Sequence, residues 1–374
     1  MSRDCNMNKT KRIDNIDLLE SIAMFFVIVY HTKSDISHNI LEEHSTVDNI
    51  DYCVRSILST CVPLFFFCNG FLLFNRPFDL KKHLTKTFKL FALALIWGSL
   101  SASFAQFVIH SGEPFCIKEF ISVLVYTKVG WNNHIWYLQA LIVLYLIFPL
   151  LKNSFDHSKP IFKYAVIMAF LIIMGCNFFC EIASIFLGKH IENKNIFLGY
   201  NPITIEHSHS LMYFLIGGTI GCYHDKIMEL LKYRMNLLLP CSLLVIICSS
   251  VLLGLYGIYV SRLEGKVWDN VWSGYGTIFT FSSVISLYIA SLSYHSKGNG
   301  MNNLIKIISC NTLGIYFLQD FYTKVFGKFC LPYLSTYGLI DNYIEKIICC
   351  FLIMFLCLLT TLVIKRIPII QKLL

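Results

Sequence analysis

Charged residues are scarce in this chain. Asp, Glu, Lys and Arg make up 14% of its 374 residues, whereas a soluble globular domain carries about 25%. Hydrophobic residues reach 56%, and the mean hydropathy is +0.61. This composition excludes a soluble enzyme, a disordered regulator and a nucleic-acid-binding domain. We therefore assign the net charge of +8 to the loops of a membrane protein, with no nucleic acid as partner.

Several motifs are also missing. No glycine-rich loop of the Walker type occurs, which excludes an ATP-driven pump. No repeat of 20–50 residues is visible, and the chain does not divide into the two similar halves of many transporters. The 15 cysteines lie mostly in apolar runs, and none has CxxC spacing with partner histidines. We read them as small buried hydrophobes and expect neither a metal site nor a disulfide framework.

Long apolar runs dominate the rest of the chain. A helix that crosses a bilayer needs about 20 mostly apolar residues. Ten such segments predict an all-α integral membrane protein, a bundle of about ten transmembrane helices. A further apolar stretch at 115–126 is too short to cross and predicts an interfacial or re-entrant helix. The ten segments are residues 16–33, 53–74, 88–109, 135–151, 161–180, 208–223, 236–260, 272–292, 304–325 and 344–364.

The basic residues divide unevenly between alternate loops. The loops on the side of the N-terminus hold 20 of the 31 Lys and Arg residues but only 8 of the 23 Asp and Glu residues. Because cytoplasmic loops are enriched in Lys and Arg, both termini are predicted to be cytoplasmic. We expect one membrane-embedded domain over residues 1–374 with no soluble domain attached, multi-pass in the cytoplasmic (inner) membrane of a cell.

The first predicted span carries two ionisable residues on one face. Glu20 and His31 are eleven residues apart, close to three helical turns or about 16 Å. Ionisable groups inside spans are costly and usually face an internal cavity. Histidine titrates near neutral pH and suits proton transfer from a hydroxyl. We predict His31 and Glu20 as the catalytic residues, while simple hydration of His31 at the outer interface stays open.

Further polar residues interrupt later apolar runs. His134 and Trp136 open the fourth span at its predicted outer end, and Asn69 lies late in the second. An aromatic belt explains the tryptophan but not the histidine. Asn69 suits hydrogen bonding between helices, and Gly70 beside it permits close helix approach, so a packing role is equally open. In the ninth span Gln319 precedes Asp320, which we place close to the outer surface.

A basic stretch follows the second span. Lys82, His83 and Lys86 lie beside the predicted cytoplasmic surface. Plain membrane topology or attraction to anionic lipid explains such a stretch. The same charges also suit the phosphates of a cytosolic donor, so these three residues are the candidates for donor binding.

Four motifs in order resemble the acyltransferase 3 family of bacterial membrane proteins, which includes O-acetylases of surface polysaccharides. Residues 134–141 are similar to the family's His-x-Trp-aromatic-Leu opening of a helix, and residues 312–316 to its late Gly-Ile-Tyr motif. Residues 16–31 and 62–72 resemble its first two spans. The resemblance implies an integral-membrane O-acyltransferase that transfers acetyl from cytosolic acetyl-CoA to a hydroxyl of a cell-surface or lipid-linked polysaccharide.

The resemblance also implies roles for single residues. His31 matches the family's first-span histidine, whereas Glu20 stands where the family has a basic residue. Lys86 and His83 replace an Arg-x-x-Arg associated with the acyl-CoA donor. His134, Trp136, Asn69 and Gln319 are assigned to the acceptor, Asn69 standing for a family serine and Gln319 for a frequent histidine. No permanently bound cofactor is expected, because the acyl-CoA is a substrate.

Two other functions fit the same pattern. A transporter or flippase for a glycan or its lipid-linked precursor also has ten spans and a polar interior. The charge reversal at Glu20 favours a non-catalytic family member in a polysaccharide assembly complex. Binding of acetyl-CoA separates the enzyme from the flippase. Transfer of succinyl in place of acetyl stays open as well, and so does N-acylation of an amino sugar.

Overall fold

The protein is helical throughout the residues described by its computed structural model, with no strand among them. Those residues are 12–32, 38–41, 46–109, 116–124, 133–191, 207–294, 300–336, 343–368 and 371. The α-helices are α1 (Asp14–His31), α2 (Thr46–Arg55), α3 (Cys61–Phe74), α4 (Leu80–Phe104), α5 (Ile117–Leu124), α6 (Trp136–His157), α7 (Lys159–Phe170), α8 (Cys176–Leu187), α10 (His209–Cys222), α11 (His224–Leu231), α12 (Met235–Glu264), α13 (Ile278–Ser291), α14 (Gly300–Cys310), α15 (Thr312–Val325), α16 (Leu331–Thr336) and α17 (Tyr343–Ile364).

The structure confirms the predicted fold class, an all-α protein with apolar helices long enough to cross a membrane. Six helical stretches are long and apolar enough to cross a membrane, and Ile278–Ser291 is a shorter apolar helix. At 14 residues, α10 and α13 each extend only about 21 Å, less than the hydrocarbon thickness of about 30 Å. The six long stretches are Thr46–Phe74, Leu80–Ile109, Trp136–His157, Lys159–Leu187, His224–Glu264 and Glu345–Ile364.

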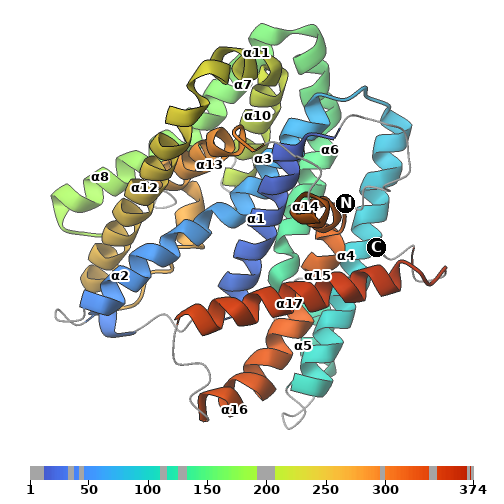
Figure 1. Ribbon diagram of the computed structural model, residues 1–374, viewed down its shortest axis with the longest axis vertical. Helices are drawn as coiled ribbons and strands as arrows, with labels where there is room; N and C mark the ends of the chain where they lie inside the picture. The colour runs from blue at the N-terminus through green and yellow to red at the C-terminus, as the bar shows by residue number, and fades with distance from the viewer. Residues whose placement is uncertain are drawn as a thin grey trace.

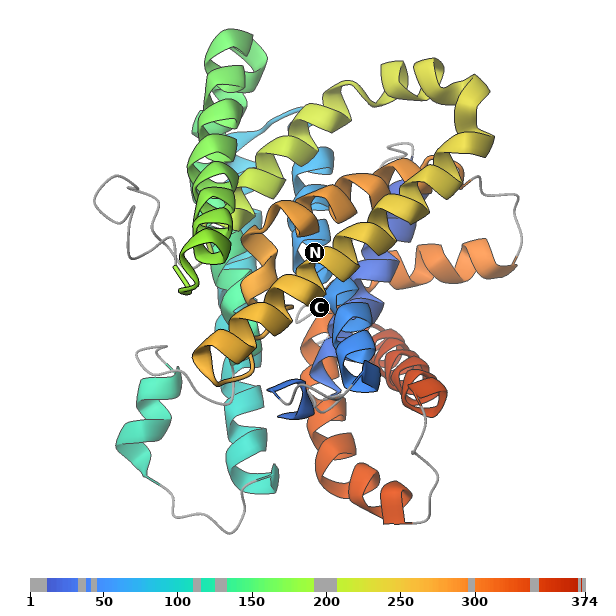
Figure 2. The same cartoon turned by 90° about the vertical axis from the view of Figure 1, so that its left-hand side faces the viewer.

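The ten predicted segments all fall on helices, but two predictions are wrong in detail. In 272–292 the α-helix begins only at Ile278, because Thr277 before it is extended. Residues 304–325 form two helices, because the chain breaks at Asn311, where φ is −118° and ψ is 10°. Figure 1 shows α14 viewed end-on beside the upper end of α15. The short apolar stretch at 115–126 does contain a short helix, α5. In both views α5 and α16 lie at the end of the molecule opposite α11 (Figures 1 and 2).

Helix α1 occupies the interior of the bundle. It packs against α3, α13, α14, α15 and α17, and α17 crosses both α15 and α1 (Figure 1). Buried side chains therefore occur on several faces of α1 and include Asp17 and Glu20. Such a surrounded position explains why a helix with three acidic residues in its first two turns can still be a core helix. It also places any polar group of α1 next to other helices and away from lipid.

The closest helix contact joins α3 and α10. Gly70 of α3 lies against the backbone of Phe214, and Gly217 of α10 lies against the backbone of Phe67. A Cβ atom at Gly70 would be 2.7 Å from the carbonyl carbon of Phe214, which is closer than real Cβ atoms come. Small residues at helix crossings allow this approach in membranes. The pair therefore fixes α3, the helix that also carries Asn69.

Candidate active site

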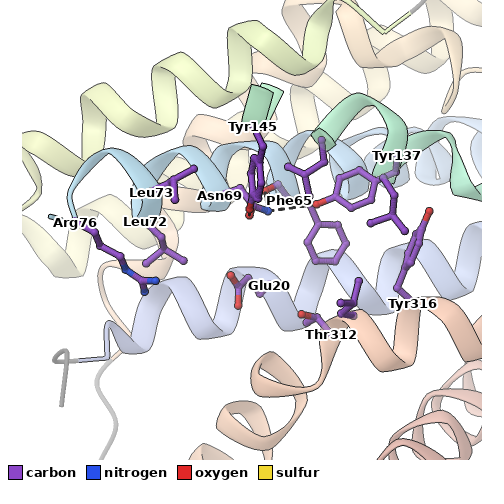
Figure 3. Close-up of a pocket in the computed structure, with 13 residues that line it drawn as sticks. Glu20, Phe65, Asn69, Leu72, Leu73, Arg76, Tyr137, Tyr145, Thr312 and Tyr316 are labelled. Carbon is purple, nitrogen blue, oxygen red and sulfur yellow. Dashed lines mark hydrogen bonds between the residues drawn. The ribbon is translucent and has the colours of Figure 1, made fainter. Parts of the chain in front are cut away.

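A cavity of about 60 Å³ lies where α1, α3, α6 and α15 meet. This volume has room for a few water molecules. Figure 3 shows side chains from all four helices around the cavity. Apolar residues with a few polar groups form its wall, as is typical of ligand pockets. Its lining residues are Glu20, Phe65, Asn69, Leu72, Leu73, Arg76, Tyr137, Leu138, Leu141, Tyr145, Thr312, Leu313 and Tyr316.

Asn69 is held in one orientation on the wall of this cavity. Its Nδ2 donates to the carbonyl of Phe65 at 2.9 Å and to the hydroxyl of Tyr137 at 3.3 Å. The hydroxyl of Tyr145 donates to Oδ1 at 3.0 Å. The amide therefore links α3 to two tyrosines of α6 and faces the cavity between them. Asn69 thus has the packing role considered from sequence, and its position on the wall also leaves a ligand contact open.

Glu20 also faces the cavity, and it belongs to a buried polar network. The hydroxyl of Ser309 lies 2.9 Å from Oε2 of Glu20 and 2.7 Å from Oδ1 of Asp17. Arg12 contacts both carboxylate oxygens of Asp17, at 2.8 and 2.9 Å. One hydroxyl has one proton, so Ser309 donates to only one of the two carboxylates at a time. Arg12 also donates to the Ser309 hydroxyl at 3.1 Å, so the network couples Glu20 to Arg12 through this serine.

Arg76 brings a cation to the same cavity. It follows the end of α3, and Figure 3 shows its guanidinium near one end of the space into which Glu20 projects. Among the lining residues, Arg76 is the basic one and Glu20 the acidic one. Arginine is the side chain best suited to phosphate, because its planar fork donates two parallel hydrogen bonds. The cavity therefore offers an anion site at one end.

Two histidines lie beyond the other end of the cavity. His134 belongs to the turn Asn133–Ile135 just before the membrane-spanning helix α6. Its carbonyl accepts a hydrogen bond from the hydroxyl of Tyr316, and the two rings are 6.0 Å apart. Tyr316 also lines the cavity, so it separates the cavity from His134. His31, the last residue of α1, is close enough to His134 for the two imidazoles to interact electrostatically.

Asp320 is the acidic partner of this histidine cluster. Its Oδ1 lies 3.3 Å from Nδ1 of His134, and Nζ of Lys324 lies 2.6 Å from Oδ2. Its charge also reaches His31. Asp320 is 8% exposed, so its carboxylate is buried inside the bundle, while its position close to the outer surface stays a prediction. The reason for the burial is that α15 packs between α1, α4 and α17, which cover it.

Burial and this carboxylate act on His134 in opposite directions. Burial lowers the pKa of His134 to about 4, and the charge of Asp320 opposes that shift. The imidazole is therefore neutral at neutral pH and can accept a proton. Its buried Nδ1 has no hydrogen-bond partner among the described residues. His31 likewise has no hydrogen-bond partner in the described part of the chain.

Trp136 and Gln319 have different surroundings. Trp136 is buried in an aromatic cluster, with its ring stacked on His207 at 4.2 Å and edge-on to Trp272 at 4.8 Å. Gln319 is fully buried on α15, and neither end of its amide has a hydrogen-bond partner within the described residues. Buried amides are nearly always paired with protein, water or ligand. Gln319 therefore has the capacity to bind a polar ligand.

The predicted donor residues lie outside the cavity lining. Lys82 is exposed, and its ammonium is 3.6 Å from Asp79, which also caps α4 by accepting from the Lys82 amide. This backbone hydrogen bond lowers the pKa of Asp79. Lys86 is exposed one turn further along α4. His83 is buried, and its Nε2 lies 2.8 Å from the carbonyl of Tyr145, so it joins α4 to α6. The donor-binding roles of these residues stay predictions.

A family model described as an acyltransferase domain matches residues 13–363. The chain belongs to the acyltransferase 3 family. Membership confirms the resemblance inferred from the four motifs, and it makes the protein a membrane acyltransferase. The matched range contains the whole cavity, the histidine cluster and the basic stretch of α4. Neither the curated proteins nor the solved structures contain a match.

Two residues of the candidate site, Arg76 and Ser309, were not singled out from sequence, and the partner of a third, Asp320, was not foreseen. Arg76 follows an apolar run and entered only the count of loop charges. Ser309 is an ordinary serine in a segment expected to be one straight helix. Asp320 was placed close to the outer surface, and its contact with His134 was not predicted. Arg76 could have been found from the sequence. It is a single arginine directly after the span that carries Asn69, so it lies at the end of the helix with this polar residue. Within the described residues, no cluster of three metal-ligating side chains occurs.

Proposed function

We propose that this acyltransferase transfers acetyl from cytosolic acetyl-CoA to a hydroxyl of a cell-surface or lipid-linked polysaccharide. The observation that carries the proposal is the arrangement along α1. The cavity with Arg76 and Glu20 lies at one end of α1, and the His31 and His134 cluster lies at the other. A charged soluble donor and an external acceptor need such a polar path through the bundle. Family membership supports the reaction class.

The donor is proposed to enter at the Arg76 end of the cavity. Its phosphates are anionic, and Arg76 supplies the charge-assisted hydrogen bonds that suit them. Lys82 and Lys86 are exposed on the neighbouring helix α4, where they attract the donor without lining the cavity. His83 acts through packing, because its ring nitrogen is already engaged by α6. Acyl-CoA is a substrate in this scheme, and no resident cofactor is needed.

The chemistry is proposed to take place near His31. This imidazole either takes the proton of the acceptor hydroxyl or briefly carries the acyl group. Glu20 contributes by ordering the opposite end of the same helix through Ser309 and Arg12. The acceptor is proposed to contact His134, Gln319 and Asn69. Trp136 contributes by shaping the outer end of the site, because its ring is enclosed by other aromatic rings.

The orientation in the membrane is part of the proposal. We infer ten spans in the cytoplasmic membrane, with both termini, Arg76 and α11 on the cytoplasmic side. The separation of α11 from α5 at opposite ends supports this arrangement (Figures 1 and 2). The short helices α10 and α13 are proposed to cross where the neighbouring protein, and not lipid, surrounds them. The whole chain then acts as one membrane-embedded domain.

Mass analysis of cell-surface glycans tests the function. We compare cells without the protein with cells that make wild type, His31→Ala or the control His157→Ala, which changes an exposed histidine at the end of α6. Wild type and His157→Ala should add the mass of one acetyl group, and His31→Ala should not. Unchanged glycans despite membrane-inserted wild-type protein would refute the proposed acceptor. A different added mass would replace acetyl by another acyl group.

A further inference from the structure

Helix α15 holds His134 at two points. The hydroxyl of Tyr316 donates to the His134 carbonyl, and four residues later Oδ1 of Asp320 lies 3.3 Å from Nδ1 of the same residue. Residues four apart lie on one face of a helix. The backbone and the ring of His134 are therefore both anchored on this face of α15. His134 is 7% exposed, so no solvent shell competes for these contacts.

The carboxylate of Asp320 is itself fixed. Its Oδ2 accepts a hydrogen bond from the hydroxyl of Ser101 on α4, and Lys324 lies at 2.6 Å. Ser101 is fully buried, and the Lys324 side chain is 22% exposed. A buried ion pair by itself adds little stability, because desolvation offsets the attraction. The other carboxylate oxygen, Oδ1, lies against the imidazole of His134. This contact does more than stabilise the protein, because it orients the ring.

We propose that Asp320 is a positioning residue that turns Nδ1 of His134 inward and leaves Nε2 to take the proton of the acceptor hydroxyl. This inference rests on the proposed function. It makes His134 the base for the acceptor, and His31 is then free to carry the acyl group. The contact at 3.3 Å is long, and Nδ1 has no aligned hydrogen bond in the described residues. Such contacts tighten when substrate binds or the ring becomes charged.

The hydroxyl proton moves to Nε2 while the oxygen forms a bond to the acyl carbon. The bond between that carbon and its carrier breaks, and the carrier leaves with the electron pair and receives the proton from Nε2. The charged or titratable groups that act on the His134 ring are Asp320 and Lys324 of α15 and His31 of α1. Asp320 is the anion among them and stabilises the ring while it is protonated.

Kinetics of the purified protein in lipid nanodiscs test this role. Asp320→Asn should lower kcat about 100-fold, because a misoriented His134 loses the contribution of a well-placed proton acceptor. The KM for donor and acceptor should change little. The control is Asp156→Asn, which breaks a similar pair four residues apart, with Lys152 at 2.7 Å, far from both histidines. It should keep the wild-type kcat. An unchanged kcat in Asp320→Asn would overturn the role.

A double variant separates positioning from charge balance. Asp320→Asn combined with Lys324→Met removes both charges of the ion pair. If Asp320 serves only to neutralise Lys324, the double variant regains wild-type kcat, and the inference is overturned. If Asp320 acts on His134, kcat stays about 100-fold down. Variants with wild-type melting temperatures make this comparison independent of folding.

The tautomer of His134 gives a readout that needs no turnover. Nitrogen-15 chemical shifts of histidine-labelled protein in bilayers, assigned with His134→Ala, should show the proton on Nδ1. Asp320→Asn should abolish this preference, because its amide can donate to Nδ1. The same tautomer in both proteins would refute the positioning role. Absence of transfer by wild type would refute the proposed function instead, and the tautomer would still decide the role of Asp320.

Discussion

Replacing Gly70 by alanine should disturb both stability and transfer. The new Cβ would overlap the carbonyl oxygen of Phe214 on α10 and lie 2.7 Å from its carbonyl carbon and 3.0 Å from its Cα. All three are backbone atoms, so no side-chain rotation relieves the overlap. Ordinary contacts begin at 3.4 Å. The helices α3 and α10 must therefore move apart by a distance on the order of 1 Å.

The expected magnitude follows from two opposing effects. Overpacking of this kind costs about 1–3 kcal/mol, and alanine recovers about 0.5–1 kcal/mol through its better helix propensity. The net loss of up to about 2.5 kcal/mol should lower the melting temperature by up to about 3 °C, because a chain of 374 residues has a large entropy of unfolding. Asn69 is the neighbouring residue and lines the cavity. A shift of about 1 Å at a substrate-contacting group can lower the rate about 100-fold.

Thermal melting and transfer assays on the same preparations measure both effects. The control is Gly175→Ala, because a Cβ atom there meets nothing within 4 Å and the residue has φ −63°. This control should match or slightly exceed wild-type stability and keep full activity. Wild-type melting and activity in Gly70→Ala would show that α3 and α10 do not approach as closely as described.

Three further predictions concern the cavity and the topology. Glu20→Gln should insert normally into the membrane, because its amide can still hydrogen-bond to the network, but should reduce transfer strongly, because the charge is lost. Full activity of Glu20→Gln together with an inactive His31→Ala would confine the chemistry to the histidine. Arg76→Ala should raise the donor KM about tenfold with little change in kcat, as donor titration would measure. If only the joint Lys82→Ala and Lys86→Ala variant changed the donor KM, the donor would not enter at Arg76. A reporter fused after the last residue should be active only in the cytoplasm, and periplasmic activity would reverse the orientation.

Helices were predictable from sequence because the bilayer imposes long apolar runs. Length and hydropathy located every one of the ten segments on a helix. They did not reveal the break at Asn311, because residues on both sides of it are apolar enough to continue one helix. Nor did they show that α13 begins only at Ile278, where 272–292 was predicted, whereas 208–223 matches α10 to within one residue at each end. Where a helix stops inside a bundle depends on its neighbours, and hydropathy does not report neighbours.

The site was predictable only along single helices. Glu20 and His31 were related by helical periodicity, and both lie on α1 as expected, at opposite ends of the polar path. Their partners come from elsewhere: Ser309 meets Glu20 because the chain breaks before α15, and Asp320 meets His134 because α15 is covered by α1 and α4.

The charge reversal at Glu20 shows why partners from other helices matter. From sequence, an acidic residue at a position where the family has a basic one appeared to remove a contact with the anionic donor. In the folded chain the cation at the cavity is Arg76, which follows α3. Glu20 instead shares Ser309 with Asp17, whose charge is met by Arg12. A basic side chain at position 20 would add a second cation beside Arg76, whereas Glu20 balances it. The reversal is therefore compatible with donor binding, provided that Arg76 and not position 20 holds the phosphates.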